Sequence, residues 1–275
     1  MTNGFHVHGF FDNFDQENSP FLLLDYASKQ FFQPSLEQRG VGSHPHRGFE
    51  TVTFAYKGAI THKDSNGGQG TIKSGDVQWM TAGSGVVHQE FFETEFNKQG
   101  GNFEMVQLWI NLPAQFKMTK PRYQEISSEQ IPIINQGDVT IKVVAGDFEY
   151  TNPEGQIIST SGIAKTYSKV NVFQINFGSQ ASLQFQSPNQ ENSMLLVLNG
   201  NIEVNGSKVQ EKSLVIFGND GQGVNISSSN QAQILFLSGE PLGEPIAHYG
   251  PFVMNTGLEL IQAFDDYNAG EFGKI

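Results

Sequence analysis

Cysteine is absent from the 275-residue sequence, which excludes a disulfide framework and any metal site built on thiolates. Basic residues are scarce too: 16 Lys and Arg stand against 28 Asp and Glu, which gives a formal net charge of −12 at pH 7. An acidic surface repels the phosphates of DNA and RNA, and no Lys/Arg-rich run offsets that repulsion. The sequence therefore predicts no direct binding to nucleic acid.

Long hydrophobic runs are also missing. No stretch approaches eighteen apolar residues, so no membrane span is expected. Residues 1–11 have no basic start, no long apolar run and no cleavage site, and they predict no signal peptide. Together with the lack of cysteine, these absences favour a cytoplasmic location.

The abundant residues indicate a packed protein rich in strands. Hydrophobic residues make up 37% of the chain and charged residues only 16%, which suits a folded core better than a disordered tail. Because 23 phenylalanines stand against 2 tryptophans, we expect cores built on phenylalanine rings. The 30 glycines fit many turns between short strands. The length suggests two domains of ordinary size or one large domain.

Short apolar segments with strand character recur along the whole chain, which predicts an all-β fold. The strand candidates cover residues 49–56, 77–80, 104–112, 170–177, 182–185, 194–198, 202–204, 214–217 and 234–237. Asn199-Gly200 and Asn205-Gly206 have the composition of hairpin turns. Residues 61–68 read as a loop because they contain an Asn-Gly and a Gly-Gly step.

The segment between Pro113 and Pro132 separates two such strand-rich halves. It carries three prolines, several charges and the pair Ser127-Ser128, which is typical of a linker. We therefore predict a first domain over residues 1–124, a linker over residues 125–132 and a second domain over residues 133–275.

One helix is predicted, close to the C-terminus. Thr256-Gly-Leu-Glu259 has the form of a capping box, and Gly270 is a plausible helix stop. Apolar residues recur between them at helical spacing: Leu260, Ile261, Phe264 and Tyr267. We expect this helix to cover a core.

Two pairs of metal-binding side chains stand at i, i+2 spacing: His44 with His46, and His88 with Glu90. In an extended strand such residues point to the same face, roughly 6.6 Å apart. If the two strands lie side by side in a barrel, three imidazoles and one carboxylate converge, a set that suits a first-row divalent metal. Pro45 is tolerated mainly at strand starts and sheet edges, which favours a position at the barrel mouth. The alternative is that these are ordinary strand histidines.

The other histidines of the first domain are not predicted to bind metal, and neither is the second domain. His6 and His8 form a further i, i+2 pair without an acid or histidine at matching spacing, so we interpret them as surface or strand-packing residues rather than a second metal site. We expect His62 to make a structural hydrogen bond. No histidine occurs between residues 91 and 247, so the second domain is predicted to be metal-free.

Several ordered blocks of the sequence resemble the pirin family, whose members are two-domain cupins. The blocks are His44-Pro-His-Arg-Gly-Phe-Glu-Thr-Val-Thr53, Gly75-Asp-Val-Gln-Trp-Met-Thr-Ala-Gly83, Gly85-Val-Val-His-Gln-Glu90, Leu108-Trp-Ile-Asn-Leu-Pro113 and Gly250-Pro-Phe-Val-Met-Asn-Thr256. The resemblance extends from about residue 20 to about residue 270. It implies a bicupin fold of two antiparallel, jelly-roll-like β-barrels with a short C-terminal helix.

The resemblance also implies a ligand set. One divalent ion would be held in the N-terminal barrel by His44, His46, His88 and Glu90. The ion is typically iron(II) in this family, with Ni, Cu, Zn, Mn and Co as alternatives. The general cupin pattern would place its ligand glutamate at Glu50 instead. That residue is on the same face as His46 if the strand is unbroken, so Glu50 is interpreted either as an orienting partner of an imidazole or as a buried structural acid.

Some family members show quercetinase activity, which implies a flavonol-like aromatic substrate and dioxygen. Glu90 would take the proton of the 3-hydroxyl group, the metal would act as a Lewis acid, and the ring would open with loss of carbon monoxide. Two alternatives stay open at this point. The protein is either a non-enzymatic, iron-dependent regulator that senses redox state and acts on a protein partner, or a protein with a purely structural metal.

Overall fold

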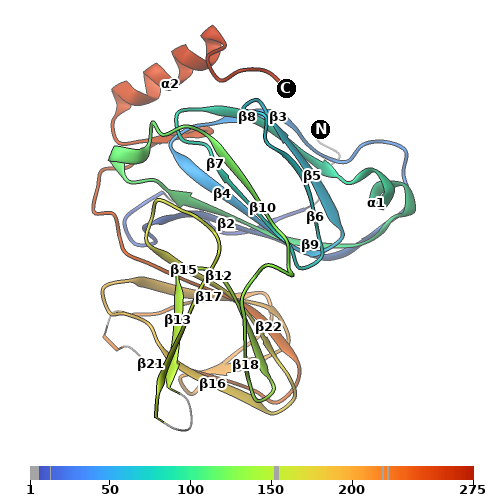
Figure 1. The fold of residues 1–275 in the computed structure, drawn as a ribbon, viewed down its shortest axis with the longest axis vertical. Helices are drawn as coiled ribbons and strands as arrows, with labels where there is room; N and C mark the ends of the chain where they lie inside the picture. Colours follow the sequence, from blue (N-terminus) through green and yellow to red (C-terminus); the bar gives the residue numbers. More distant parts are fainter. Residues whose placement is uncertain (1–5, 13, 152–154, 219, 222) are drawn as a thin grey trace. The chain divides into compact units, whose positions relative to one another are not determined.

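The computed structural model describes residues 6–12, 14–151, 155–218, 220–221 and 223–275. In these ranges the chain is mostly β-strand with two α-helices, and the all-β bicupin prediction is confirmed. The chain divides into two compact units, coloured along the sequence in Figure 1: unit 1 contains residues 1–128 and 242–275, and unit 2 contains residues 129–241. Neither helix combines the length and hydropathy needed to cross a bilayer.

Unit 1 contains two antiparallel sheets of six and four strands. The six-stranded sheet has the order β1-β2-β9-β4-β7-β10 and the four-stranded sheet the order β3-β8-β5-β6. Their bounds are β1 His8–Phe11, β2 Phe21–Phe32, β3 Gly40–His46, β4 Phe49–Lys57, β5 Ala59–Asp64, β6 Gln69–Lys73, β7 Val77–Thr81, β8 Val86–Phe92, β9 Gly101–Asn111 and β10 Arg122–Ile126. The helix α1 Thr94–Gln99, the 3-10 turn η1 Ala114–Phe116, the hairpin of β23 Ala247–Tyr249 and β24 Phe252–Met254, and the helix α2 Gly257–Ala269 complete it.

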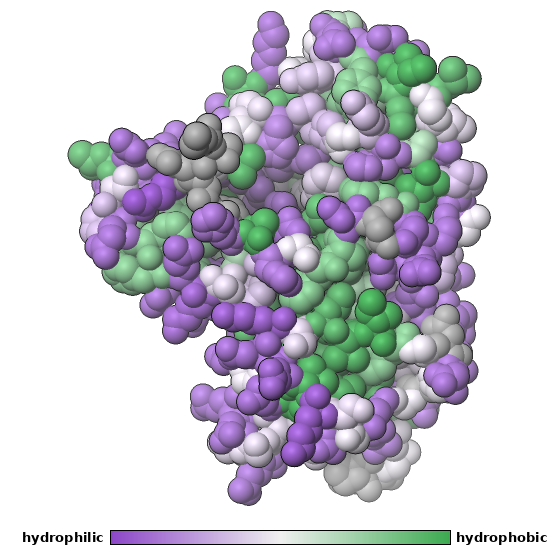
Figure 2. Space-filling view, turned by 180° about the vertical axis from the view of Figure 1, so that it is seen from behind, coloured by the Kyte–Doolittle hydropathy of each residue, from purple (hydrophilic) through white to green (hydrophobic). Residues whose placement is uncertain are grey.

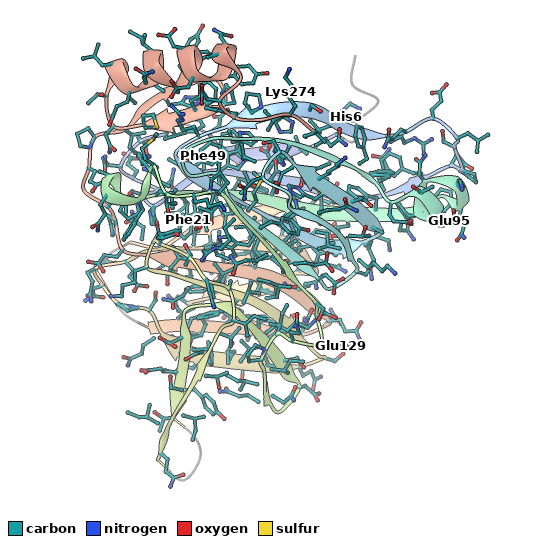
Figure 3. All side chains as sticks on the ribbon, turned by 45° about the horizontal axis from the view of Figure 1, so that its top comes forward. His6, Phe21, Phe49, Glu95, Glu129 and Lys274 are labelled. Atoms are coloured by element: carbon teal, nitrogen blue, oxygen red, sulfur yellow. The ribbon has the colours of Figure 1, made fainter. Side chains whose placement is uncertain are left out.

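The core of unit 1 lies around the central strands of the larger sheet. Every residue of β7 and all but the last of β4 are buried. Phe49 and Trp79 are fully buried there, and Figure 3 shows Phe49 within the unit while Glu95 on α1 lies at its edge. β4 and β7 pair with each other in antiparallel register, so this core lies at the centre of the larger sheet.

Unit 2 repeats the two-sheet plan. A six-stranded sheet has the order β11-β12-β15-β22-β17-β20, a four-stranded sheet the order β16-β21-β18-β19, and β13 and β14 form a separate hairpin. The bounds are β11 Ile133–Gln136, β12 Val139–Ala145, β13 Asp147–Thr151, β14 Ile157–Ser161, β15 Val170–Phe177, β16 Ala181–Gln186, β17 Asn192–Asn199, β18 Ile202–Val204, β19 Ser207–Val209, β20 Ser213–Ile216, β21 Gly223–Ser228 and β22 Ala232–Gly239. Its core holds several phenylalanines, as the composition predicted.

The predicted hairpin at Asn205-Gly206 is confirmed. Asn205 has a φ of 48° and Gly206 a φ of 82°, which is the pair of positive values that a two-residue type I′ turn requires. Val204 and Ser207 pair directly across this turn, at the junction of β18 and β19. The strands predicted over 170–177 and 202–204 coincide with β15 and β18.

The predicted C-terminal helix is confirmed as α2, including its caps. Thr256 Oγ1 accepts a hydrogen bond from the backbone N–H of Glu259, and the Glu259 side chain accepts one from the Thr256 backbone N–H. Gly270 ends the helix with a φ of 84°, in the left-handed region that glycine adopts without strain.

The predicted domain limits need two corrections. Residues 125 and 126 of the predicted linker complete β10, which pairs with β7. Residues 242–275, predicted to belong to the second domain, instead pack within unit 1. There Phe252, Ala263 and Phe272 form a hydrophobic cluster with Val87. The apolar face of α2 needs a hydrophobic surface to cover, and unit 1 provides it.

The buried side chain of Lys117 binds the same C-terminal segment through a hydrogen bond to Val253. Its side chain is 2% exposed, and Nζ donates to Gly48 O at 2.8 Å, Asn111 Oδ1 at 2.7 Å and Val253 O at 2.9 Å. Burial lowers the pKa of Lys117 from its ordinary 10.5 to about 7, against the opposing pull of Glu244 and Glu259.

This shift predicts a pH-dependent contribution to stability. Between pH 7 and 10 the unfolded chain binds a proton at Lys117 that the folded chain does not, so raising the pH favours folding. Relative to a Lys117→Met variant, we expect the free energy of unfolding of the unaltered protein to increase by about 1.4 kcal/mol per pH unit in this window. Urea unfolding of both proteins at several pH values measures the difference, and a pH-independent difference contradicts the prediction.

The molecular surface is largely hydrophilic. Hydrophilic residues cover most of the face in Figure 2, and hydrophobic residues show at several places between them, most densely in the lower middle of the view.

Candidate metal centre

The candidate site is built on β8, which lies between β3 and β5 in the four-stranded sheet of unit 1. On one side His44 of β3 pairs with His88. On the other side Asp64 of β5 pairs with His88, and His62 pairs with Glu90. Residues directly opposite each other in an antiparallel pair project from the same face of the sheet. The strand register therefore places His44, His88 and Asp64 in one row across the sheet. His62 and Glu90 lie in the next row.

His44, His46 and His88 form the first group of candidate ligands. Their ligating atoms lie within 4.8 Å of one another. The ring centroids of His44 and His88 are 4.2 Å apart, and that of His46 is 4.8 Å from each of them. His46 and His88 are 3% and 0% exposed, whereas His44 is half-buried. The predicted convergence of the three imidazoles is present.

Burial keeps the imidazoles of His46 and His88 neutral. Burial, reinforced by the neighbouring His44, lowers the pKa of His46 to about 3. Burial also lowers the pKa of His88 well below 6.5, and the nearby His46, His44 and His62 add to the effect. Both rings are therefore neutral at pH 7, which is the form that ligates a metal.

His88 contributes a buried polar atom that no protein group satisfies. Its Nε2 is buried and has no hydrogen-bond partner among the described residues. Leaving a buried polar atom unpaired costs about 1–3 kcal/mol, so such atoms normally have a function or a partner. A metal ion held by His88 would satisfy this atom, and the surrounding donors are of the type that first-row metals prefer.

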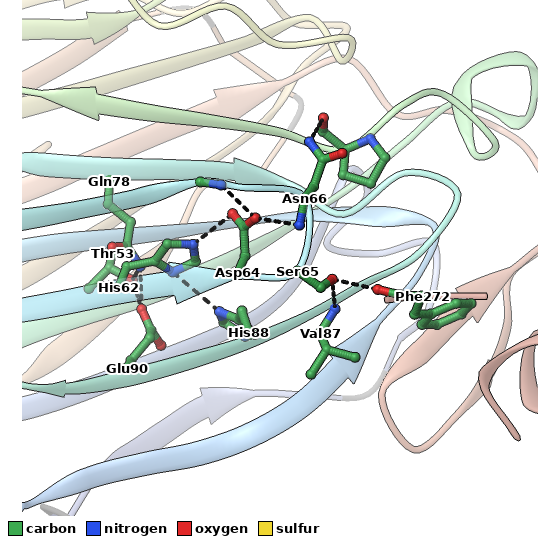
Figure 4. A network of polar contacts seen from close by, with 12 residues as sticks. Thr53, His62, Asp64, Ser65, Asn66, Gln78, Val87, His88, Glu90 and Phe272 are labelled. Carbon is green, nitrogen blue, oxygen red and sulfur yellow. Dashed lines mark hydrogen bonds and ion pairs between the residues drawn. The ribbon is translucent and has the colours of Figure 1, made fainter. Parts of the chain in front are cut away.

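Glu90 is held in place by three neutral donors. Its Oε1 accepts hydrogen bonds from Thr53 Oγ1 at 3.2 Å and from Gln78 Nε2, and its Oε2 accepts one from Gln107 Nε2 at 3.1 Å. The side chain is 8% exposed, and Figure 4 shows it in the polar network around His62 and His88. These contacts fix the orientation of the carboxylate without neutralising it.

Glu90 enters the site through a second group, formed with His62 and His88. The ligating atoms of these three residues also lie within 4.8 Å of one another. His62 Nδ1 is 3.5 Å from His88 Nδ1, and His62 Nε2 is 3.0 Å from Asp64 Oδ2. The ring of His62 stacks on Tyr123 at a centroid distance of 4.4 Å. The four predicted ligands thus lie in two overlapping groups that share His88, with His62 as an additional member.

The sequence interpretation missed the position of His62 because it read residues 61–68 as a loop. The structure continues β5 to Asp64, and only the following four residues turn. Asp64 Oδ1 accepts hydrogen bonds from the backbone N–H groups of Asn66 and Gly68 at 2.9 and 2.8 Å, which builds the turn. The i, i+2 spacing of His62 and Asp64 was the signal available in the sequence.

The remaining predicted residues lie outside both groups. Glu50 is fully buried, and its Oε1 accepts a hydrogen bond from Thr81 Oγ1 at 2.6 Å. β3 ends at His46 and β4 begins at Phe49, with Gly48 between them at a φ of 88°. The alternation of side chains between the two faces therefore does not continue from His46 to Glu50. An orienting role of Glu50 stays a prediction. His6 and His8 are exposed and belong to neither group.

A His62→Phe variant tests whether His62 is a structural residue or a ligand. Phenylalanine preserves the stacking on Tyr123, but Asp64 Oδ2 loses its partner. We expect unchanged metal content and a free energy of unfolding lowered by about 1–3 kcal/mol. Elemental analysis and denaturant unfolding measure the two quantities, with His8→Phe as the exposed control. Loss of the metal in His62→Phe alone contradicts a purely structural role, because His62 then either ligates the metal or positions His88 for it.

Two antiparallel barrel-like units, one of which carries a cluster of histidines and a glutamate, define a two-domain cupin with a candidate metal site. Family comparison agrees and is more specific. Residues 5–110 match the pirin family model, and residues 172–273 match that of the pirin C-terminal cupin domain. The chain belongs to the pirin family.

Individual relatives support this assignment. The chain is 41% identical over 276 aligned residues to a Pseudomonas aeruginosa protein named "Putative quercetin 2,3-dioxygenase", covering 99% of this chain and 93% of that protein. It is 40% identical to pirin-like protein 2 of Arabidopsis thaliana, covering 92% and 75% of the two chains. The crystal structure of a quercetin 2,3-dioxygenase from Acinetobacter baumannii superposes with a TM-score of 0.91 at 46% identity, covering 100% of this chain and 94% of that one.

Proposed function

We propose that this protein is a metal-dependent dioxygenase that opens the ring of a flavonol such as quercetin. In this proposal His44, His46, His88 and Glu90 hold one divalent ion, iron(II), with Ni, Cu, Zn, Mn and Co as alternatives. The observation that carries the proposal is the unpartnered, buried Nε2 of His88, whose ring lies beside those of His44 and His46. Relatives named as quercetin 2,3-dioxygenases support the reaction class.

The metal, when bound, supplies Lewis acidity toward a substrate oxygen. Three imidazoles and one carboxylate suit a first-row ion with remaining coordination positions. His46 and His88 contribute neutral ligands because burial depresses the pKa of each ring. Glu90 contributes the negative charge.

Glu90 is also the residue that would accept the proton of the flavonol 3-hydroxyl group. Its Oε1 already accepts two hydrogen bonds, from Thr53 and Gln78, whereas Oε2 accepts one from Gln107. Oε2 therefore has the greater capacity to take a further proton. The three donors hold the carboxylate still while the proton moves, which preserves its alignment.

Trp109 provides a second feature suited to a flat, oxygenated aromatic substrate. Its ring centroid lies 5.1 Å from that of His46 and 4.3 Å from that of Phe49. Its Nε1 is buried and has no hydrogen-bond partner among the described residues. An aromatic wall with a spare N–H donor beside the imidazoles can pack against a substrate ring and donate to one of its oxygens.

Dioxygen uptake with quercetin tests the proposed reaction. With iron-loaded protein in air we expect one dioxygen consumed and one carbon monoxide released per quercetin, and no reaction without dioxygen. Metal-depleted protein is the matched control. Substrate loss without dioxygen uptake overturns the proposal. An absence of turnover, with affinity for a protein partner that changes with the oxidation state of iron, instead identifies the regulatory alternative.

A further inference from the structure

Unit 2 contains a cavity for which the proposed dioxygenase chemistry has no use. Its volume is about 390 Å³, which is within the range of small-molecule sites. Part of its wall is aromatic: Phe148, Phe173, Phe185 and Phe236 all line it, and all are buried in the unit's core. The cavity thus combines polar lining with an aromatic part of its wall, and it has room for a substituted benzene ring.

A buried carboxylate lies on the wall of this cavity. Glu191 is 3% exposed, and its Oε2 accepts hydrogen bonds from Asn171 Nδ2 at 3.0 Å and Ser238 Oγ at 2.7 Å. Asn171 and Ser238 face each other across β15 and β22, so the sheet itself positions these donors. Oε1 has no hydrogen-bond partner, and no ion pair reaches Glu191, within the described part of the chain.

The charges around the cavity favour a cationic occupant. Asp147 and Glu149 also line it, so three carboxylates meet one basic residue, Lys169. Lys169 is exposed and pairs with Glu240 at 3.2 Å. Oε1 is the oxygen of Glu191 that has no protein donor, and a ligand cation there would form a charge-assisted hydrogen bond with it.

The aromatic wall favours the same occupant. An ammonium group over the face of a phenylalanine ring is attracted by the ring quadrupole, and this attraction strengthens when water is excluded. A carboxylate next to aromatic rings therefore selects an ammonium ion over a neutral molecule of equal shape. An anion meets repulsion from all three carboxylates.

We propose that the unit 2 cavity binds a small organic ammonium ion with an aromatic body, whose nitrogen donates to Glu191 Oε1 while its ring packs on the phenylalanine wall. This assigns to the second cupin unit a ligand-binding role of its own. It does not depend on the metal or on the reaction proposed for unit 1.

Titration calorimetry of the full-length, metal-loaded protein with 2-phenylethylamine tests this assignment, with 2-phenylethanol as the neutral molecule of similar shape. We expect the amine to bind at least about tenfold more tightly than the alcohol, because only the amine makes a charge-assisted hydrogen bond. Equal affinities, or no binding of the amine, overturn the proposal. This comparison uses the unaltered chain and so does not rely on any variant folding.

Two variants locate the binding. Glu191→Gln keeps an acceptor for Asn171 and Ser238 but removes the charge, and it should weaken amine binding at least about tenfold. Glu211→Gln changes an exposed carboxylate of unit 2 that does not line this cavity, and it should leave the affinity within about twofold. Equal losses in both variants contradict a specific role of Glu191.

The metal centre must also be ruled out as the amine site, since amines can ligate metals. A His88→Ala chain should bind 2-phenylethylamine as tightly as the unaltered protein. If its amine binding disappears together with the metal, the amine binds in unit 1 and the assignment to unit 2 is wrong. A failure of quercetin turnover would leave this result untouched.

Discussion

Replacing His88 with alanine is expected to remove most of the bound metal. His88 is the residue shared by both candidate groups, and its Nε2 is the buried atom without a partner. The remaining three ligands bind more weakly, and we expect the metal affinity to fall on the order of 100-fold or more. Elemental analysis of purified protein after dialysis against a weak chelator measures the loss.

His6→Ala is the matched control for this experiment. His6 is an exposed histidine outside both groups, so its removal should leave the metal content unchanged. Thermal unfolding of each metal-depleted protein checks that His88→Ala still folds. Full metal content in His88→Ala contradicts the proposed ligand set, and a loss of one equivalent in His6→Ala reveals a site at the N-terminal pair.

Glu90→Gln is expected to reduce turnover far more than it reduces metal content. Glutamine is nearly isosteric, but its amide cannot accept the substrate proton, and general-base catalysis typically contributes about 10²–10⁴-fold. Gln78 and Gln107 both donate hydrogen bonds to Glu90, so the NH₂ group of the new glutamine would face another donor. We therefore expect some loss of affinity for the metal as well. Turnover is therefore compared at equal metal occupancy, determined by elemental analysis.

Glu104→Gln serves as the control for this second substitution. Glu104 is another buried glutamate of unit 1; its Oε1 accepts a hydrogen bond from Tyr26 at 2.5 Å, and it lies outside both candidate groups. A glutamine oxygen can accept the same bond, so turnover should stay near that of the unaltered protein. Normal turnover of Glu90→Gln would show that Glu90 takes no part in the proton transfer.

The unequal success of the sequence-based predictions follows from the range over which each interaction acts. The α2 caps and the Asn205-Gly206 turn involve residues within four positions of each other, and these predictions are confirmed. The i, i+2 spacing likewise brought His44 and His46 together, because strand geometry alone relates them.

Errors arose where distant segments determine the structure. His62 and Asp64 were assigned to a loop because their local composition resembles one, and pairing with β8 extends the strand instead. Residues 242–275 were assigned to the second domain because they follow it along the chain. Their apolar side chains, including Phe252 and Phe272, pack against Val87 in unit 1.

The sequence by itself determined the family, the strand-rich architecture and four of the candidate ligands, His44, His46, His88 and Glu90, since these depend on residue type and short spacing. The tertiary structure alone decided which neighbours surround them. It placed His62 beside His88 through the register of β5 on β8, and it joined Glu191 to Asn171 and Ser238 next to an aromatic cavity. Such contacts join residues far apart along the chain, and only the packing of whole strands fixes them.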